Sequence, residues 1–231
     1  MQVEKLKVAI LGTGNIGTDL LIKTMRSDHL ECSLFTGRNL SSAGMVKANH
    51  LGVRISDRGV DAIVDDPECC DLVFDATSAV AHERHWPLLD RLGKTVIDMT
   101  PAKLGVMCVP AINLQECLSH RNVNMVTCGV QASIPIAHAI RKSQSNVEYI
   151  EVVSSISSRS AGPATRLNLD EYILTTEKAL RDFTNANRTK AILILNPAQP
   201  PIDMQTTIFA KINDPDIERV RTEVARIVEK I

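Results

Sequence analysis

The stretch Lys7–Gly17, which reads Lys-Val-Ala-Ile-Leu-Gly-Thr-Gly-Asn-Ile-Gly, decides the fold of the first half of the chain. An apolar run ends at Leu11, glycines follow at the next, third and sixth positions, and a helical pattern starts at Asn15. Gly-x-Gly-x-x-Gly between a strand and a helix is the fingerprint of a dinucleotide-binding βαβ unit. The glycines make the turn, let the backbone approach a pyrophosphate, and allow close helix packing. A glycine-rich turn without a ligand is the alternative interpretation.

Strands and helices are predicted to alternate after this loop. Strands are expected at Lys7–Leu11, Glu31–Thr36, Val53–Ile55, Asp71–Ala76, Lys94–Asp98 and Val123–Thr127. Helices are expected at Asn15–Arg26, Gly44–His50 and Ala79–Leu92, the last broken at Pro87. This alternation predicts an N-terminal Rossmann-type, doubly wound parallel sheet.

The pattern changes after residue 128. A helix is expected at Ser133–Lys142, a long β-branched strand at Val147–Ser157, a helix at Leu169–Phe183, strands at Lys190–Leu195 and Met204–Ile212, and a closing helix capped by Asp214. We therefore expect an α/β protein with a dinucleotide-binding domain over residues 1–128. An α+β catalytic and dimerisation domain is expected over residues 129–231.

Composition excludes several classes of function. The net charge is −1 and aromatic residues make up 3% of the chain, so neither a basic footprint nor a stacking platform for nucleic acid is expected. The N-terminus is not that of a signal peptide, and no apolar run reaches the ~20 residues of a membrane span. The six cysteines have no Cys-x-x-Cys spacing. We expect a cytoplasmic protein with reduced thiols and no metal.

Cys128 stands out among these cysteines because of its neighbours. In Asn124–Pro135 an apolar run ends at the thiol, a glycine follows, and residues typical of a helix start come next. This order predicts a sulfur at the C-terminal end of a strand, facing a helix N-terminus. Such an N-terminus favours a thiolate and stabilises the oxyanion formed when a thiolate attacks a carbonyl. A buried structural cysteine is the alternative.

The end of the second predicted strand bears on which dinucleotide binds. An acidic residue at this point would bind the ribose 2′-hydroxyl of NAD, but Thr36–Ser42 reads Thr-Gly-Arg-Asn-Leu-Ser-Ser, without a carboxylate. Arg38 is predicted to pair with a 2′-phosphate instead, helped by Ser41 or Ser42. We therefore expect NADP to be accepted beside NAD, and to be preferred where Arg38 makes this contact. A solvated loop arginine is the alternative.

The dinucleotide loop and the thiol together predict hydride transfer with covalent catalysis. Attack of a thiolate on an aldehyde gives a thiohemiacetal, and loss of hydride to nicotinamide leaves a thioester. The acyl acceptor is then water, phosphate or another thiol, and the chemistry alone does not choose among them.

Five stretches identify a family. They are Gly14–Leu20, Phe74–Ala79, Asn122–Gly129, Ser160–Arg166 and Ile194–Ala198. On these stretches the chain resembles the acylating acetaldehyde dehydrogenases, which oxidise acetaldehyde to acetyl-coenzyme A and often associate with 4-hydroxy-2-oxovalerate aldolase. The resemblance implies the same NAD(P)-dependent reaction with coenzyme A as co-substrate, a homo-oligomer, an aldolase-type partner and a place in aromatic hydrocarbon catabolism.

The resemblance also assigns site residues, position by position. Cys128 corresponds to the nucleophile that bears the acyl thioester. The first nucleotide-binding segment comprises Thr13, Gly14, Asn15 and Ile16, to which the glycine motif adds Gly12 and Gly17 and the strand argument adds Arg38. The second segment, a loop near the nicotinamide, comprises Ser158, Arg159, Ser160, Ala161, Gly162, Pro163, Ala164, Thr165 and Arg166. A plain connector is the alternative for this loop.

Three departures from the family pattern are expected to matter. Val130 replaces the second glycine of Cys-Gly-Gly-Gln, which should narrow the space beside the thiol. Thr206 replaces the acidic residue of the family's Arg-Asp-Thr, so a carboxylate thought to help catalysis should be missing. Family members also continue beyond the position of Ile231, with a tail that contacts the nucleotide.

Two other functions stay open. The departures favour a shorter, weakly active or inactive relative that acts as an aldolase-associated subunit. A phosphate-using semialdehyde dehydrogenase is a weaker match, because no histidine has the spacing of a partner for Cys128. His82 and His85 are predicted to lie on a solvated helix face, and His138 in the packing of the helix after the thiol.

Overall fold

The computed structural model describes residues 4–162, 166 and 169–231, which form two compact units. The first unit comprises residues 4–106 together with Leu118–Asn124. The second comprises Met107–Cys117 and Met125–Ile231. The chain therefore passes between the units three times, and each unit is described separately below.

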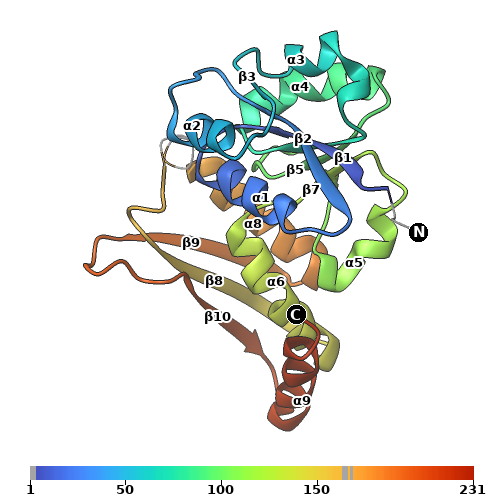
Figure 1. The fold of residues 1–231 in the computed structure, drawn as a ribbon. Helices are drawn as coiled ribbons and strands as arrows, with labels where there is room; N and C mark the ends of the chain where they lie inside the picture. The colour runs from blue at the N-terminus through green and yellow to red at the C-terminus, as the bar shows by residue number, and fades with distance from the viewer. Residues whose placement is uncertain (1–3, 163–165, 167–168) are drawn as a thin grey trace. The chain divides into compact units, whose positions relative to one another are not determined.

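The first unit is built on a parallel sheet, shown in Figure 1. The sheet order is β3-β2-β1-β4-β5-β7-β6. Its strands are β1 Leu6–Leu11, β2 Leu30–Thr36, β3 Ile55–Ser56, β4 Leu72–Asp75, β5 Thr95–Asp98, β6 Val106–Met107 and β7 Asn122–Asn124. Because β1 lies between β2 and β4, the strand order reverses beside the β1–α1 loop, where doubly wound folds bind ligands.

Helices cover both faces of this sheet (Figure 1). The helices of the unit are α1 Asn15–Met25, α2 Ala43–His50, α3 Asp61–Asp65, the 3₁₀ turn η1 Pro67–Cys69 and α4 Ala79–Arg91. On one face Ile10 and Phe35 pack with Leu21 of α1 and Met45 of α2. On the other face the strands pack with buried residues of α3 and α4. The predicted Rossmann-type doubly wound sheet is confirmed.

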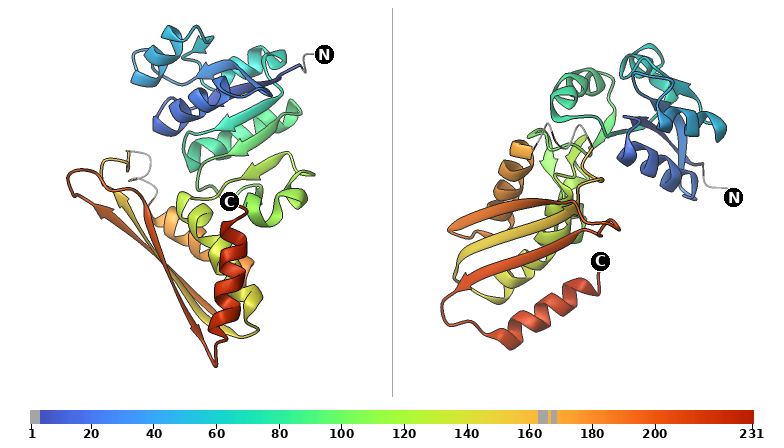
Figure 2. Two further views of the ribbon diagram at one scale, coloured as in Figure 1. Left: turned by 60° about the horizontal axis from the view of Figure 1, so that its bottom comes forward. Right: turned by 90° about the vertical axis from the view of Figure 1, so that its left-hand side faces the viewer.

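The second unit is a three-stranded sheet, β10-β8-β9, with helices against one of its faces (Figure 2). Its elements are α5 Pro110–Cys117, α6 Cys128–Ser143, β8 Val147–Ser157, α8 Leu169–Thr184, β9 Arg188–Asn196, β10 Gln205–Ile212 and α9 Ile217–Val228. Along β8 every second residue is buried, from Ile150 to Ile156, and this face packs against α6 and α8. The predicted α+β architecture is confirmed.

Four predicted details are wrong, each for a local reason. The helix α4 continues through Pro87, which removes one backbone hydrogen bond without ending the helix. The strand β7 ends at Asn124, and α6 starts five residues before the predicted Ser133. The cap of α9 is Asp216, whose side chain accepts from Arg219 N, whereas Asp214 takes a left-handed backbone conformation with φ of 53°.

No helix in the described part of the chain combines the length and apolar character that crossing a membrane requires.

Candidate active site

The three glycines of the β1–α1 loop have separate geometric roles. Gly12 has φ of +104°, and a Cβ there would lie 2.5 Å from Ala76 O. A Cβ on Gly17 would lie 1.8 Å from Gly12 O, so α1 approaches the turn closely. A Cβ on Gly14 would meet nothing within 4 Å. Packing therefore requires the outer two glycines, whereas the middle one faces open space where a ligand can approach.

No side chain caps the N-terminus of α1. Gly14 is the N-cap and has no side chain to accept from the helix amides. These amides and the helix dipole form a site for a negatively charged group such as a phosphate. The residues predicted for the first nucleotide-binding segment, from Gly12 to Gly17, thus share one turn.

The loop after β2 lies against this turn. Thr13 Oγ1 lies 3.1 Å from Ser42 Oγ, and a Cβ on Gly37 would lie 2.6 Å from the Thr13 methyl group. Ser42 is also the N-cap of α2, accepting from Met45 N at 3.4 Å. The hydroxyl of Ser42 is therefore engaged within the protein. Arg38 is exposed on the same loop.

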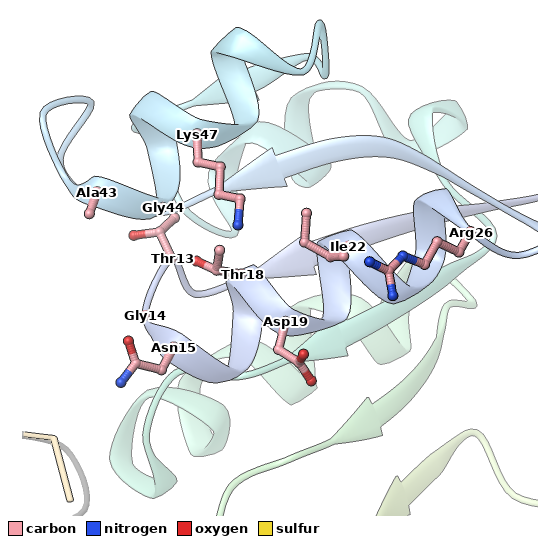
Figure 3. Close-up of a pocket in the computed structure, with 10 residues that line it drawn as sticks. All are labelled: Thr13, Gly14, Asn15, Thr18, Asp19, Ile22, Arg26, Ala43, Gly44 and Lys47. Atoms are coloured by element: carbon pink, nitrogen blue, oxygen red, sulfur yellow. The ribbon is translucent and has the colours of Figure 1, made fainter. Parts of the chain in front are cut away.

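A groove of about 650 Å³ runs along α1 and α2 (Figure 3). Thr13, Gly14 and Asn15 line one end of it. Lys47 reaches from α2 toward α1, and Arg26 lies farther along α1. Asp19 also lines the groove, so its lining carries two positive charges and one negative charge. The net positive charge beside the glycine-rich loop favours an anionic ligand.

In the second unit, Cys128 is the first residue of α6 and its thiol is exposed. Thr127 caps the helix, its hydroxyl accepting from Val130 N at 3.1 Å. The prediction that a strand ends at the thiol is wrong, because residues 125–127 separate it from β7. The first amides of a helix lack partners one turn earlier, so the N-terminus of α6 can stabilise a thiolate or an oxyanion.

The other cysteines differ from Cys128 in exposure. Cys69, Cys70, Cys108 and Cys117 are buried, and Cys32 is partly buried. Burial raises the pKa of Cys32, Cys70 and Cys108 to about 12, so these thiols stay protonated at neutral pH. Cys128 is the one cysteine on the described surface with an exposed thiol.

The segment before Cys128 is held in a strained conformation. Val126 has φ of 64°, a left-handed conformation that β-branched residues rarely adopt, and its side chain is 2% exposed. Gln131 clamps this segment, since its amide donates to Met125 O at 2.8 Å and to Cys108 O at 2.7 Å. Backbone strain of this kind persists where surrounding structure enforces it, and it is concentrated at functional sites.

The hydroxyl of Tyr172 lies close to the thiol. Cys128 Sγ lies 4.0 Å from Tyr172 Oη, and Tyr172 is 7% exposed. Ser154 Oγ lies 3.4 Å from Thr206 Oγ1, on neighbouring strands. Val130, which was expected to narrow the space beside the thiol, is fully buried in the core of the unit. Sequence reasoning missed Tyr172, because it lies 44 residues from Cys128 along the chain.

The loop predicted as the second nucleotide-binding segment is closed by its own arginine. Arg166 donates to Ser158 O at 2.9 Å, to Ser158 Oγ at 3.0 Å and to Ala161 O at 3.0 Å. Ser160 N donates to Ser157 O, and Gly162 N donates to Ser160 O. Arg159 is also in this turn, whereas Pro163, Ala164 and Thr165 lie outside the described residues. Arg166 therefore shapes the loop through these hydrogen bonds, and its charged side chain is exposed.

The prediction that His82 and His85 lie on a solvated helix face is wrong, because both belong to a buried polar cluster of the first unit. His82 is fully buried, and its Nδ1 donates to Asp75 Oδ2 at 3.0 Å. His85, with 15% of its side chain exposed, donates to the same oxygen at 2.8 Å. The two histidines thus face the sheet and not solvent. The signal in the sequence was an aspartate at the last residue of two adjacent buried strands, Asp75 and Asp98, whose charges require partners.

The cluster shifts the titration of its members. Burial alone would raise the pKa of Asp75, but hydrogen bonds from His82 and His85 outweigh it and lower that pKa. Burial would lower the pKa of His82, but the hydrogen bond to Asp75 and the nearby Asp98 charge raise it. Burial raises the pKa of Asp98 to about 6, against the field of His82. His138, in contrast, is used in packing, with Nδ1 3.0 Å from Phe183 O.

Within the described residues, no group of three or more His, Cys, Asp or Glu side chains is arranged to hold a metal ion.

Comparison with known families matches both halves of the chain. Residues 7–120 match the semialdehyde dehydrogenase NAD-binding domain, so the first unit contains a domain of a nicotinamide-binding family. Residues 128–231 match the family described as prokaryotic acetaldehyde dehydrogenase, dimerisation.

Individual proteins agree with these matches. The chain is 66% identical over 99% of its length to an acetaldehyde dehydrogenase of Pectobacterium atrosepticum, of which it covers 78%. It is 56% identical over its full length to an acetaldehyde dehydrogenase of Spirochaeta aurantia, of which it covers 77%. In fold it resembles aspartate semialdehyde dehydrogenase II of Vibrio cholerae, with a TM-score of 0.70 and 15% identity over 96% of this chain and 79% of the other.

Proposed function

The chain belongs to the acetaldehyde dehydrogenase family, and on this basis we propose that it oxidises a small aldehyde and transfers the acyl group to coenzyme A through Cys128. The observation that supports this chemistry is the exposed thiol at the first residue of α6. Family membership supports the aldehyde as substrate. The role of coenzyme A rests on the resemblance to acylating members of the family.

The residues of the first unit fit a nicotinamide dinucleotide. The uncapped N-terminus of α1 and the open space at Gly14 suit a pyrophosphate, with Thr13 and Asn15 beside it. The loop from Ser158 to Arg166 is proposed as the second contact. The cofactor, when bound, supplies the acceptor for the hydride that leaves the aldehyde carbon.

The second unit supplies the covalent chemistry in this proposal. Cys128 Sγ forms a bond to the aldehyde carbon, and the carbonyl electron pair moves to oxygen. The first amides of α6 are proposed to stabilise that oxyanion. After the carbon loses hydride, it is bound to Cys128 as a thioester. The sulfur of coenzyme A then attacks the acyl carbon, and the Cys128 thiolate leaves.

Replacement of the thiol tests the function. Cys128→Ala should abolish aldehyde- and coenzyme-A-dependent reduction of NAD⁺ and NADP⁺, while Cys32→Ala, at a partly buried site, should leave it intact. Full turnover by Cys128→Ala would contradict the proposal. Turnover that requires phosphate and ignores coenzyme A would point to the semialdehyde dehydrogenase alternative.

We further propose that NADP is accepted and preferred. Arg38 is exposed on the loop that packs on Thr13, and Lys47 adds charge in the adjoining groove. Because Ser42 is engaged as a cap, Ser41 is the serine proposed to assist. Arg38→Ala should lower kcat/KM for NADP about 10–100-fold, the effect of losing charge-assisted hydrogen bonds, and leave that for NAD nearly unchanged. An unchanged ratio of the two values would contradict the preference.

Association with an aldolase of the 4-hydroxy-2-oxovalerate type is proposed from the resemblance alone. Co-expression and co-purification with such an aldolase tests it. Stable binding by a chain that gives no coenzyme-A-dependent turnover would favour the alternative of an inactive, aldolase-associated subunit.

A further inference from the structure

Tyr172 brings a phenol to the thiol from another helix of the same unit. Its Oη lies 4.0 Å from Cys128 Sγ, and its side chain is buried to 7% exposure. Oriented donors at this range interact weakly with a neutral thiol and more strongly with a thiolate, because the charge strengthens the hydrogen bond.

Gly129 is what admits the phenol. A Cβ on Gly129 would lie 2.1 Å from Tyr172 Oη and 3.0 Å from Cζ. Any side chain there would displace the hydroxyl from the N-terminus of α6. The absence of a side chain at Gly129 therefore leaves the space beside Cys128 that the Tyr172 phenol occupies.

The hydroxyls of Ser154 and Thr206 lie on the sheet beside the Tyr172 phenol. Ser154 lies beside the phenol, since a Cβ on Gly129 would meet Tyr172 Oη at 2.1 Å and Ser154 Oγ at 3.3 Å. Ser154 is 1% exposed and stands opposite Thr206 across the β8–β10 pair, with 3.4 Å between their oxygens. Tyr172, Ser154 and Thr206 thus form a line of hydroxyls that ends at the thiol. The position where the family pattern has a carboxylate, Thr206, is the far end of this line.

We propose that Tyr172 is a positioning residue whose hydroxyl donates a hydrogen bond to the Cys128 thiolate and fixes its direction, with Ser154 and Thr206 holding the phenol in place. The proposal deepens the proposed function and rests on Cys128 being its nucleophile. Burial, reinforced by the negative charge of Cys128, raises the pKa of Tyr172, so the phenol keeps its proton and acts as a donor. The step needs no co-reactant, because the hydrogen bond transfers no atom.

The test is Tyr172→Phe, which keeps the ring and removes only the hydroxyl. Alkylation of Cys128 by iodoacetamide is followed against pH by peptide mass spectrometry, with Cys128→Ser as background. We expect the midpoint of the rate profile to move up by about one pH unit, as the loss of one hydrogen bond to a charged group produces. The kcat for aldehyde should fall about tenfold with the KM for aldehyde unchanged.

Thr184→Val is the matched control. Thr184 is the last residue of α8, about three turns beyond Tyr172, and it is fully buried. Its hydroxyl donates to Leu180 O and accepts from Ala186 N at 3.3 Å. The substitution removes a buried hydroxyl from the same helix at a distance from the thiol, so thermal stability should fall while the alkylation profile stays in place. An equal move of the profile in Thr184→Val would assign the effect to helix packing and overturn the proposal.

Other outcomes are equally decisive. Superimposed alkylation profiles of Tyr172→Phe and wild type would overturn the proposal, even if the wild type is an active dehydrogenase. A shifted profile would support it even if no aldehyde is turned over, since alkylation requires neither cofactor nor coenzyme A. Should Tyr172→Phe fold poorly, Ser154→Ala should give a smaller shift in the same direction, and no shift would count against the proposal.

Discussion

Asp75 is a buried carboxylate that accepts hydrogen bonds from two histidines of α4. Its Oδ2 accepts from His82 and His85, and its Oδ1 accepts from Thr77 N at 3.1 Å. In Asp75→Asn a neutral amide would face the two imidazoles, and the buried negative charge that accepts their hydrogen bonds would be lost. We expect a loss of about 3–5 kcal/mol in the free energy of unfolding, the usual effect of removing one partner of a buried pair.

Urea denaturation measures this loss, with Asp66→Asn as control. Asp66 pairs with Arg54 at 2.8 Å, but 43% of the Asp66 side chain and 57% of the Arg54 side chain are exposed. Exposed pairs contribute little, so the control should change stability by less than about 1 kcal/mol. Similar losses in the two variants would mean that the cluster does not stabilise the first unit.

Asp98 makes stability depend on pH in a defined window. Its Oδ1 accepts from Thr100 N at 2.7 Å, and burial raises its pKa from 3.8 to about 6. A carboxyl with a raised folded-state pKa contributes stability that is fully present below pH 3.8 and is lost as the pH rises through about 6. The wild type should therefore lose on the order of 3 kcal/mol between these values from this group.

The comparison with Asp98→Asn isolates this contribution. The variant should be less stable, because its amide would face the Asn124 Nδ2 donor that now lies 2.6 Å from Asp98 Oδ2. Its free energy of unfolding should also fall less between pH 4 and pH 6 than that of the wild type, measured by urea titration at each pH. A parallel pH dependence in the two proteins would show that Asp98 titrates normally.

At the scale of elements, the β1–α1 loop separates a folding role from a binding role. Gly17→Ala places a Cβ 1.8 Å from Gly12 O and should destabilise the first unit by at least 1–3 kcal/mol. Gly14→Ala meets no atom within 4 Å, so the loss of stability should stay below about 1 kcal/mol, the difference between glycine and alanine at an N-cap. The added methyl group should nevertheless weaken cofactor binding at least tenfold, because it stands where a pyrophosphate approaches. Cofactor fluorescence titration and thermal melting distinguish the two effects; unchanged affinity in Gly14→Ala would place the pyrophosphate elsewhere.

Sequence patterns predicted the elements wherever local and tertiary preferences agree. β8 was predicted with both of its bounds, because its alternating β-branched residues fit a half-buried central strand. The start of α6 was misplaced, since Thr127 is a good cap but the strained Val126 that precedes it is enforced by tertiary packing. The burial of His82 and the approach of Tyr172 to Cys128 were missed for the same reason. Both depend on which helix covers which strand, and spacing along one element does not encode that.

At the scale of the whole molecule, one face of the three-stranded sheet is not covered by helices, and residues 128–231 match a family described as a dimerisation domain. Residues of β8 that alternate with the buried ones, such as Tyr149 and Glu151, are partly exposed. Phe209, opposite Glu151, is 54% exposed, and Ile194, opposite Ser155, is 46% exposed. Large apolar side chains on one face of a sheet whose other face is covered are typical of an interface. We propose that a second copy of the chain covers this face.

Phe209→Arg tests the proposed dimer. Loss of a large aromatic side chain from the interface should weaken association by at least 2 kcal/mol, which is about a 30-fold rise in the dimer Kd. Light scattering after size exclusion, at a concentration where the wild type is dimeric, should then show monomer. Val80→Arg is the control, because Val80 is 56% exposed on α4 of the other unit and the same charge there should leave the dimer intact. Equal dimer Kd values for Phe209→Arg and the wild type, from a dilution series that dissociates both, would mean that a different surface joins the copies. The open sheet face would then require another occupant.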